Sequence, residues 1–123
     1  MNNLTLFFYI FIGGGIGSLS RFGVGKIISS LTVSKFPLGT LFANILATLF
    51  LGLTIYYFKD KLDNNNFIKY FIVIGFCGGF STFSTFSLET VTLFKDGLMF
   101  YGILNIILSL LIAFSILWVL IKS

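Results

Sequence analysis

Long apolar stretches separated by short polar connections run along almost the whole chain. Four such stretches follow one another: Leu4 to about Leu19, Leu38 to Phe58, Phe67 to about Phe94, and Gly97 to Ile121. A helix needs about 20 residues to cross the hydrocarbon of a bilayer. The pattern therefore predicts four membrane-spanning helices in one domain of residues 1–123, with the first helix continuing through Ile28.

The connections and the composition support this interpretation. Pro37 directly precedes the second stretch, where its missing N–H suits the first turn of a helix. The connection from Lys59 to Asn66 is too rich in charges and turn-forming residues to lie in hydrocarbon. Hydrophobic residues make up 57% of the chain and charged residues only 10%, whereas soluble domains carry about 25% charged residues. We therefore expect an all-α integral membrane protein.

Several functional classes fit this composition poorly. The chain has no histidine, one cysteine and four acidic residues, so the usual clusters of metal ligands and pairs of nucleophile and base are missing. Enzyme activity is therefore not expected. The net charge of +4 comes from basic residues scattered singly along the chain, whereas a nucleic-acid interface needs a basic stripe or cluster. No nucleic-acid partner is expected.

The basic residues also bear on the orientation in the membrane. If the spans alternate, one side holds Lys59, Lys61, Lys69 and Lys122, and the other holds Arg21, Lys26, Lys35 and Lys95. An excess of Lys and Arg marks the cytoplasmic side, and these two sets are equal. The balance is compatible with insertion in both orientations. Two oppositely inserted copies would form a closed two-fold pair, so we expect an antiparallel, dual-topology homodimer.

The third stretch contains an unusual polar segment from Gly75 to Glu89, with two adjacent glycines and five hydroxyl residues. Non-helical backbone at membrane depth is tolerated only where protein buries it or a wet cavity adjoins it, and broken helices there commonly form ion sites. We therefore predict that the third helix is broken near Gly78 to Thr82. Carbonyls freed there would be hard ligands for a small cation, and the amides of the following half-helix would favour an anion.

Phe83 and Phe86 are three residues apart, so both project from one face if the segment after the break is helical. An aromatic ring has a negative face and a positive edge. Ring edges could therefore receive a small anion without trapping it with a full charge, which suits conduction. In a chain with 17 phenylalanines, the two could also be packing or lipid-facing residues.

Three segments carry a resemblance to a known family. The third stretch contains Gly75-Phe76-Cys77-Gly78-Gly79 followed by Thr82-Phe83-Ser84-Thr85-Phe86-Ser87. Two further segments agree, namely Gly14 to Arg21, and Pro37 to Leu41 with Asn44 and Gly52. In order and spacing, over nearly the whole chain, the sequence resembles the Fluc (CrcB) fluoride channels. The motif of the third stretch is the most specific part of this resemblance.

The resemblance implies a dual-topology homodimer with two narrow anion pores and a structural sodium ion at the dimer centre. Backbone carbonyls of Gly78 and Ser81 from both copies would hold the sodium. Phe83 and Phe86 would be the pore phenylalanines, and the amide of Asn44 would donate a hydrogen bond to fluoride. The remaining polar lining of the pore would come from Ser84, Thr85 and Ser109.

Each of three other polar residues allows two interpretations. Arg21 could line a vestibule that attracts anions or could reach the lipid headgroups. Glu89 could serve the ion pathway, because burying a charge is costly, or could support a helix by pairing with a basic or hydroxyl residue. Asn105 could line a pore or only bond between helices. Helix packing is the expected role of the small-residue pairs, Gly13 with Gly17 and Gly75 with Gly79.

The function implied by the resemblance is passive. Hydrogen fluoride crosses a membrane uncharged and releases fluoride in the more alkaline cytoplasm, and a fluoride-selective pore would let the ion leave and so reduce its toxicity. A small multidrug transporter is also a short four-span chain, but it needs an acidic residue in its first span, and this first span has none. A non-transporting assembly subunit would explain the glycines but not the polar segment. The expected location is a bacterial inner membrane, with the chain crossing it several times.

Overall fold

The computed structural model describes residues 2–123, which form helices and short connections without any strand. In chain order, the elements are α1 (Asn3–Leu31), α2 (Leu38–Phe58), η1 (Lys59–Lys61), η2 (Phe67–Cys77), α3 (Gly78–Phe80), α4 (Phe83–Lys95) and α5 (Met99–Lys122). The η1 segment is one tight 3₁₀ turn, and η2 has the wider hydrogen bonding of a π-helix.

Four helical stretches are long and apolar enough to cross a membrane: Asn3–Leu31, Leu38–Lys61, Phe67–Lys95 and Met99–Lys122. The all-α membrane architecture expected from the sequence is confirmed at this level. The last helix begins two residues after the predicted start at Gly97, because Gly97 has a φ of +82° and forms the turn out of α4. That turn is closed by a hydrogen bond of 2.8 Å from the amide of Leu98 to the carbonyl of Leu93.

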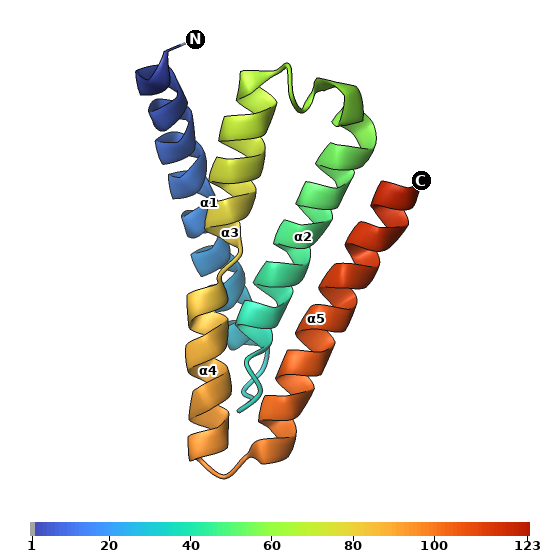
Figure 1. The fold of residues 1–123 in the computed structure, drawn as a ribbon. Coiled ribbons are helices and arrows are strands. Elements are labelled where there is room, and N and C mark those ends of the chain that lie inside the picture. The colour runs from blue at the N-terminus through green and yellow to red at the C-terminus, as the bar shows by residue number, and fades with distance from the viewer. Residues whose placement is uncertain (1) are drawn as a thin grey trace.

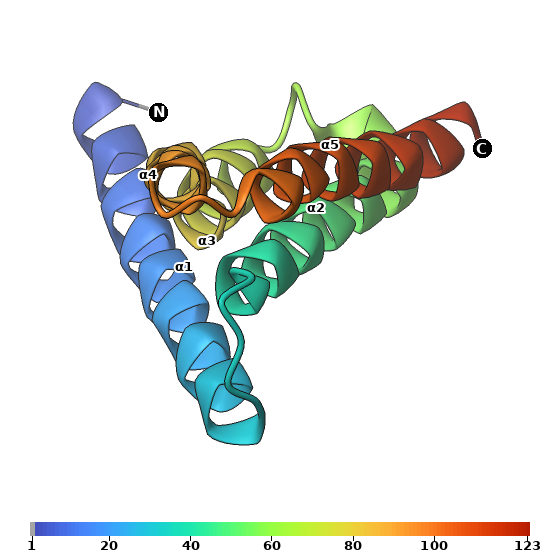
Figure 2. The same ribbon diagram turned by 90° about the horizontal axis from the view of Figure 1, so that it is seen from below.

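The helices run alternately up and down (Figure 1). Both termini lie at the end that also carries the connection between α2 and η2, and the connection between α4 and α5 lies at the other end. α1 packs against η2 and α3, whereas α2 packs against α5. Figure 2 shows that α1 lies at an angle to α2 and α5. The second half of α1 packs against the start of α2, where a Cβ atom built on Gly39 would lie 3.3 Å from the Cα of Gly25. The third span has α1, α2 and, through α4, α5 as its neighbours.

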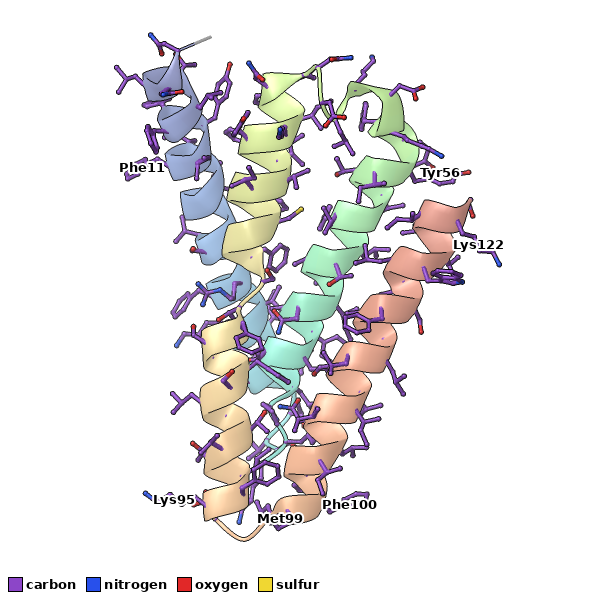
Figure 3. The ribbon with its side chains drawn as sticks, in the orientation of Figure 1. Phe11, Tyr56, Lys95, Met99, Phe100 and Lys122 are labelled. Atoms are coloured by element: carbon purple, nitrogen blue, oxygen red, sulfur yellow. The ribbon has the colours of Figure 1, made fainter. Side chains whose placement is uncertain are left out.

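The labelled side chains near the two ends of the bundle show which chain segments lie at each end. Lys95, Met99 and Phe100 lie toward one end of the bundle, and Tyr56 and Lys122 lie toward the opposite end (Figure 3). Phe11 on α1 points away from the other helices (Figure 3) and is 76% exposed. A large apolar side chain in that position suits contact with lipid.

Glycines hold α1 against the third span. A Cβ atom built on Gly17 would overlap the carbonyl oxygen of Phe76 and would lie 2.8 Å from the amide nitrogen of Phe80. A Cβ atom on Gly75 would lie 3.1 Å from the Cα of Gly13. The backbones therefore approach so closely that no side chain fits between them, and the packing role predicted for the glycine pairs is confirmed.

The backbone leaves the helical conformation over two residues in the middle of the third span. Ser81 (φ −82°, ψ 158°) and Thr82 (φ −150°, ψ 119°) are extended between α3 and α4. Gly78 is helical, with φ −65° and ψ −36°. The expectation of irregular backbone from Gly78 onward was therefore wrong for the two glycines, which lie in the helical segment α3. Gly79 packs closely against Gly14 of α1, whereas a Cβ atom on Gly78 would meet only the carbonyl of Val73 in its own span, at 3.9 Å.

The close contact at Gly17 predicts a large difference between two alanine substitutions that lie two residues apart. Gly17→Ala should lower stability by about 1–3 kcal/mol, because the added methyl group meets backbone atoms that cannot move aside. Gly15→Ala is the matched control, since nothing lies within 4 Å of a Cβ atom there. The thermal midpoints of both variants, measured in detergent, check this expectation. Equal midpoints would contradict it.

Candidate functional site

Asn44 on α2 binds the extended part of the third span. Its Oδ1 accepts a hydrogen bond of 2.8 Å from the amide of Thr82, and its Nδ2 donates one of 3.3 Å to the carbonyl of Thr82. Thr82 has left the helical hydrogen-bond pattern, and an unpaired backbone group in a membrane costs several kcal/mol. A single side chain therefore satisfies both backbone groups of Thr82 and fixes the extended residues to α2.

Thr82 also begins the helix that follows. Its hydroxyl oxygen accepts a hydrogen bond of 3.2 Å from the amide of Thr85, so Thr82 is the N-cap of α4, and it lies 3.3 Å from the hydroxyl of Ser84. Thr82 was not among the predicted site residues. The preference for threonine at N-caps, applied to a hydroxyl residue just after the predicted break, could have identified it.

The end of α3 frees several carbonyl groups. Nε of Arg21 donates a hydrogen bond of 3.2 Å to the carbonyl of Gly79, and the amide and hydroxyl of Ser81 both donate to the carbonyl of Cys77, at 3.1 Å each. Within residues 2–123, the hydrogen bonds around the extended residues Ser81 and Thr82 do not use the carbonyls of Gly78 or Ser81. These two carbonyls are therefore available as oxygen ligands.

A first cavity of about 220 Å³ lies between α2, the extended residues, α4 and α5. Its lining comprises Asn44, Thr48, Ser81, Thr82, Phe83, Phe86, Ser109, Leu110 and Ala113. The ring centroids of Phe83 and Phe86 are 6.0 Å apart, with 41° between the ring planes. Phe83 is 79% exposed and Phe86 is partly buried. The cavity thus combines two aromatic rings with the amide of Asn44 and the hydroxyl of Ser109.

A second cavity of about 380 Å³ lies between α1, α2 and α4. Its polar side chains are Arg21, Lys26, Ser29, Thr40, Thr82, Thr85 and Glu89. The carboxyl group of Glu89 lies beside the hydroxyl of Thr40, and its Oε1 is buried without a hydrogen-bond partner in the described part of the chain. Two basic residues and one acid make this cavity positive overall, which favours anions.

The predicted site residues thus fall into two groups that meet at Thr82, which lines both cavities. The first cavity holds Asn44, Ser81, Phe83, Phe86 and Ser109, and the second holds Arg21, Thr85 and Glu89. Gly78 and Ser84 are exposed and lie outside both linings. Asn105 is only 1% exposed and donates a hydrogen bond of 2.9 Å to Thr90, so it does bond between helices.

The donor set around the extended residues fits a small hard cation better than a transition metal. Residues 2–123 contain no group of three or more His, Cys, Asp or Glu side chains that could hold a metal. The carbonyls of Gly78 and Ser81 are hard oxygen donors, and both residues are exposed on a single chain. Their chemistry therefore fits the sodium ion that the sequence resemblance implies.

Comparison with protein families decides the membership of this chain. A family model described as "CrcB-like protein, Camphor Resistance (CrcB)" matches residues 8–121. The chain belongs to the CrcB family. The match covers most or all of each of the four spans and every residue of the two cavities, so the site described above lies within the family domain.

Curated members of the CrcB family resemble the chain over most of its length. A protein from Nitratiruptor sp. named "Fluoride-specific ion channel FluC" is 38% identical over 113 residues, which cover 92% of this chain and 87% of that protein. Proteins with the same name from Azobacteroides pseudotrichonymphae and Coxiella burnetii are 44% and 36% identical, over 85% and 89% of this chain and 86% and 89% of their own lengths. The resemblance found in the sequence is confirmed.

The two hydrogen bonds of Asn44 predict a loss of stability when its amide is removed. Asn44→Ala should lower the free energy of unfolding by about 1–3 kcal/mol, because it leaves two partly buried backbone groups of Thr82 unpaired. Thr48→Val is the matched control, since Thr48 lines the same cavity but bonds only to the carbonyl of Asn44 in its own helix. Thermal midpoints in detergent measure both. A control that loses as much as Asn44→Ala would contradict the role assigned to Asn44.

Proposed function

We propose that this chain is one subunit of a fluoride-selective ion channel that lets cytoplasmic fluoride leave the cell passively and so reduces fluoride toxicity. The observation that carries the proposal is the first cavity, where Asn44, Phe83, Phe86 and Ser109 meet. The name of the curated relatives, "Fluoride-specific ion channel FluC", supports the choice of ion. The chain acts as a channel and not as an enzyme.

Selectivity for fluoride follows when hydrogen-bond donors of the protein replace the hydration shell of the ion in a narrow space. The Nδ2 of Asn44 has two hydrogens, and the carbonyl of Thr82 takes one, so the second is available to an anion. The ring edges of Phe83 and Phe86 supply weakly positive contacts without a full charge. Larger halides would be rejected by size, and the absence of a fixed charge in this cavity allows release.

The second cavity would draw anions toward the extended residues. Arg21 and Lys26 line it together with Thr85, and Thr82 connects it to the first cavity. Positive side chains in a low-dielectric recess raise the local anion concentration. We assign Arg21 to this vestibule and Glu89 to support of the helices through its neighbour Thr40. Thr85 and Ser84 provide hydroxyl groups at the start of α4.

The channel is an antiparallel, dual-topology homodimer. Gly78, Ser81 and Ser84 are exposed on the single chain although they lie in the middle of a span. Polar backbone at membrane depth has to be covered by protein or line a wet cavity, so a second copy is the simplest cover. Basic residues at both ends of the bundle, such as Lys95 and Lys122 (Figure 3), allow insertion in either orientation.

A sodium ion at the centre of the dimer would hold the two third spans together. The carbonyls of Gly78 and Ser81 from each copy would be its ligands, and its charge would stabilise extended backbone that has lost helical hydrogen bonds. The location that suits this function is the inner membrane of a bacterium, crossed four times by each chain.

Flux from liposomes tests the function directly. The purified protein is reconstituted into liposomes loaded with fluoride or with chloride, and efflux is followed with ion-selective electrodes after a potassium ionophore is added. We expect rapid fluoride efflux without chloride efflux. Proton-coupled drug efflux in place of fluoride flux would instead indicate a multidrug transporter, and absence of any flux from a folded dimer would indicate an assembly subunit.

The aromatic lining gives a sharper expectation in the same assay. Phe83→Ile and Phe86→Ile should each lower fluoride efflux about tenfold or more, since each removes ring edges from the first cavity. Phe11→Ile is the matched control, because Phe11 is 76% exposed and points away from the other helices (Figure 3). Gel filtration verifies that all three variants stay dimeric. Normal flux through both Phe83→Ile and Phe86→Ile would refute the assignment of the pore.

The cation site is tested by replacing sodium. Purification and reconstitution with N-methylglucamine instead of sodium should lower the thermal midpoint of the dimer and abolish most of the fluoride efflux, since the carbonyls of Gly78 and Ser81 would lose the cation that they bind. Adding sodium back should restore both, and adding potassium serves as the control. The same midpoint and efflux in all three media would contradict a structural sodium ion.

A further inference from the structure

A buried chain of hydrogen bonds connects α5 with the pore phenylalanine on α4. The hydroxyl of Thr90 donates to the carbonyl of Phe86 at 2.7 Å, and Nδ2 of Asn105 donates to the Thr90 hydroxyl oxygen at 2.9 Å. The hydroxyl of Ser109 donates to Oδ1 of Asn105 at 3.4 Å. Asn105 is 1% exposed and Thr90 is 5% exposed, so water does not compete for these bonds.

The direction of every bond in this chain follows from its first member. The carbonyl of Phe86 can only accept, so the single hydroxyl proton of Thr90 points toward it. The oxygen of Thr90 must then accept, which requires the NH₂ group of Asn105 on that side. Oδ1 of Asn105 consequently faces Ser109, and Ser109 has to donate. The orientation of the Asn105 amide is therefore fixed without reference to any ion.

This direction has a consequence for the first cavity, which Ser109 lines. A serine hydroxyl has one proton, and here that proton points to Asn105, so the lone pairs of Ser109 remain for the cavity. Lone pairs repel an anion. At 3.4 Å the bond from Ser109 to Asn105 is long for a hydroxyl donor, and a long hydrogen bond is weak. The hydroxyl can therefore turn toward an anion at a moderate cost.

We propose that Asn105 is a positioning residue that competes with the permeating anion for the proton of Ser109 and so weakens anion binding in the first cavity. This inference rests on the proposed function, with fluoride as the anion. Weak binding favours release, which a conducting pathway needs as much as selectivity. Asn105 touches no ion itself and acts through Ser109 and, by way of Thr90, through the backbone of Phe86.

Asn105→Leu tests this competition, because leucine has the same branching and number of side-chain heavy atoms as asparagine and cannot accept the proton. Fluoride currents are measured in planar bilayers over a range of fluoride concentrations. The fluoride concentration that gives half-maximal current should fall about 2- to 10-fold, the range that corresponds to one ordinary hydrogen bond. In a Ser109→Ala background the same substitution should cause no shift, since no proton remains to be released.

Thr90→Val provides a second variant that preserves the shape of the side chain. Without the oxygen of Thr90, the amide of Asn105 is free to turn its NH₂ group toward Ser109, and the proton of Ser109 is again released. The half-maximal concentration should therefore fall in Thr90→Val as well, and not in Thr90→Val with Ser109→Ala. If Asn105→Leu yields no dimer on gel filtration, this pair of variants decides the question.

The outcomes separate this inference from the proposed function. Wild-type protein that carries no fluoride current overturns both. Wild-type protein that conducts, with variants whose half-maximal concentration is unchanged or rises, overturns only the role of Asn105. A shift of equal size with and without Ser109 would also overturn it, because it would reveal a general effect on packing. A fall that requires Ser109 supports the proposal.

Discussion

The structure depends on one constraint, which is that two extended residues lie in the middle of a membrane span. The amide of Ser81 still bonds to the carbonyl of Cys77 as in a helix, but the backbone groups of Thr82 have left the helical pattern, and hydrocarbon offers no water to replace those bonds. Asn44 bonds both backbone groups of Thr82 from the side of α2, and Arg21 bonds the carbonyl of Gly79 from the side of α1. The third span is thus held from two sides, and both cavities adjoin the place where it is held.

The close packing of glycines makes this arrangement possible. α1 can reach the end of α3 with Arg21 only because Gly13 and Gly17 let its backbone touch the third span. The same contact places Lys26 and the last turns of α1 beside the second cavity. The packing of α1, the hydrogen bond of Arg21 and the positive lining of the second cavity therefore all depend on one set of small residues. Substitutions at these glycines, far from the ion path, can be expected to alter that path.

Much of this architecture could be predicted from the sequence, because bilayer thickness limits helix length. The predicted second span, Leu38 to Phe58, coincides with α2, and the hydroxyl-rich segment contains the two extended residues. The path through Asn105, Thr90 and Ser109 could not be predicted. Gly102, Asn105 and Ser109 share one face of α5 by their spacing, but the sequence does not indicate that Thr90 of α4 lies opposite that face. The start of the irregular backbone was placed too early, at Gly78, because a glycine can also serve close packing within a regular helix, as Gly79 does here.

The reversal potential of the current tests the central claim most directly. Purified protein is placed in a planar bilayer with a tenfold gradient of fluoride and equal chloride on both sides. A pathway that conducts fluoride alone predicts a current that reverses at the equilibrium potential of fluoride, about 59 mV from zero for a tenfold gradient of a singly charged ion. Reversal near zero would show that chloride passes as well, and would contradict a fluoride-selective pathway through these cavities.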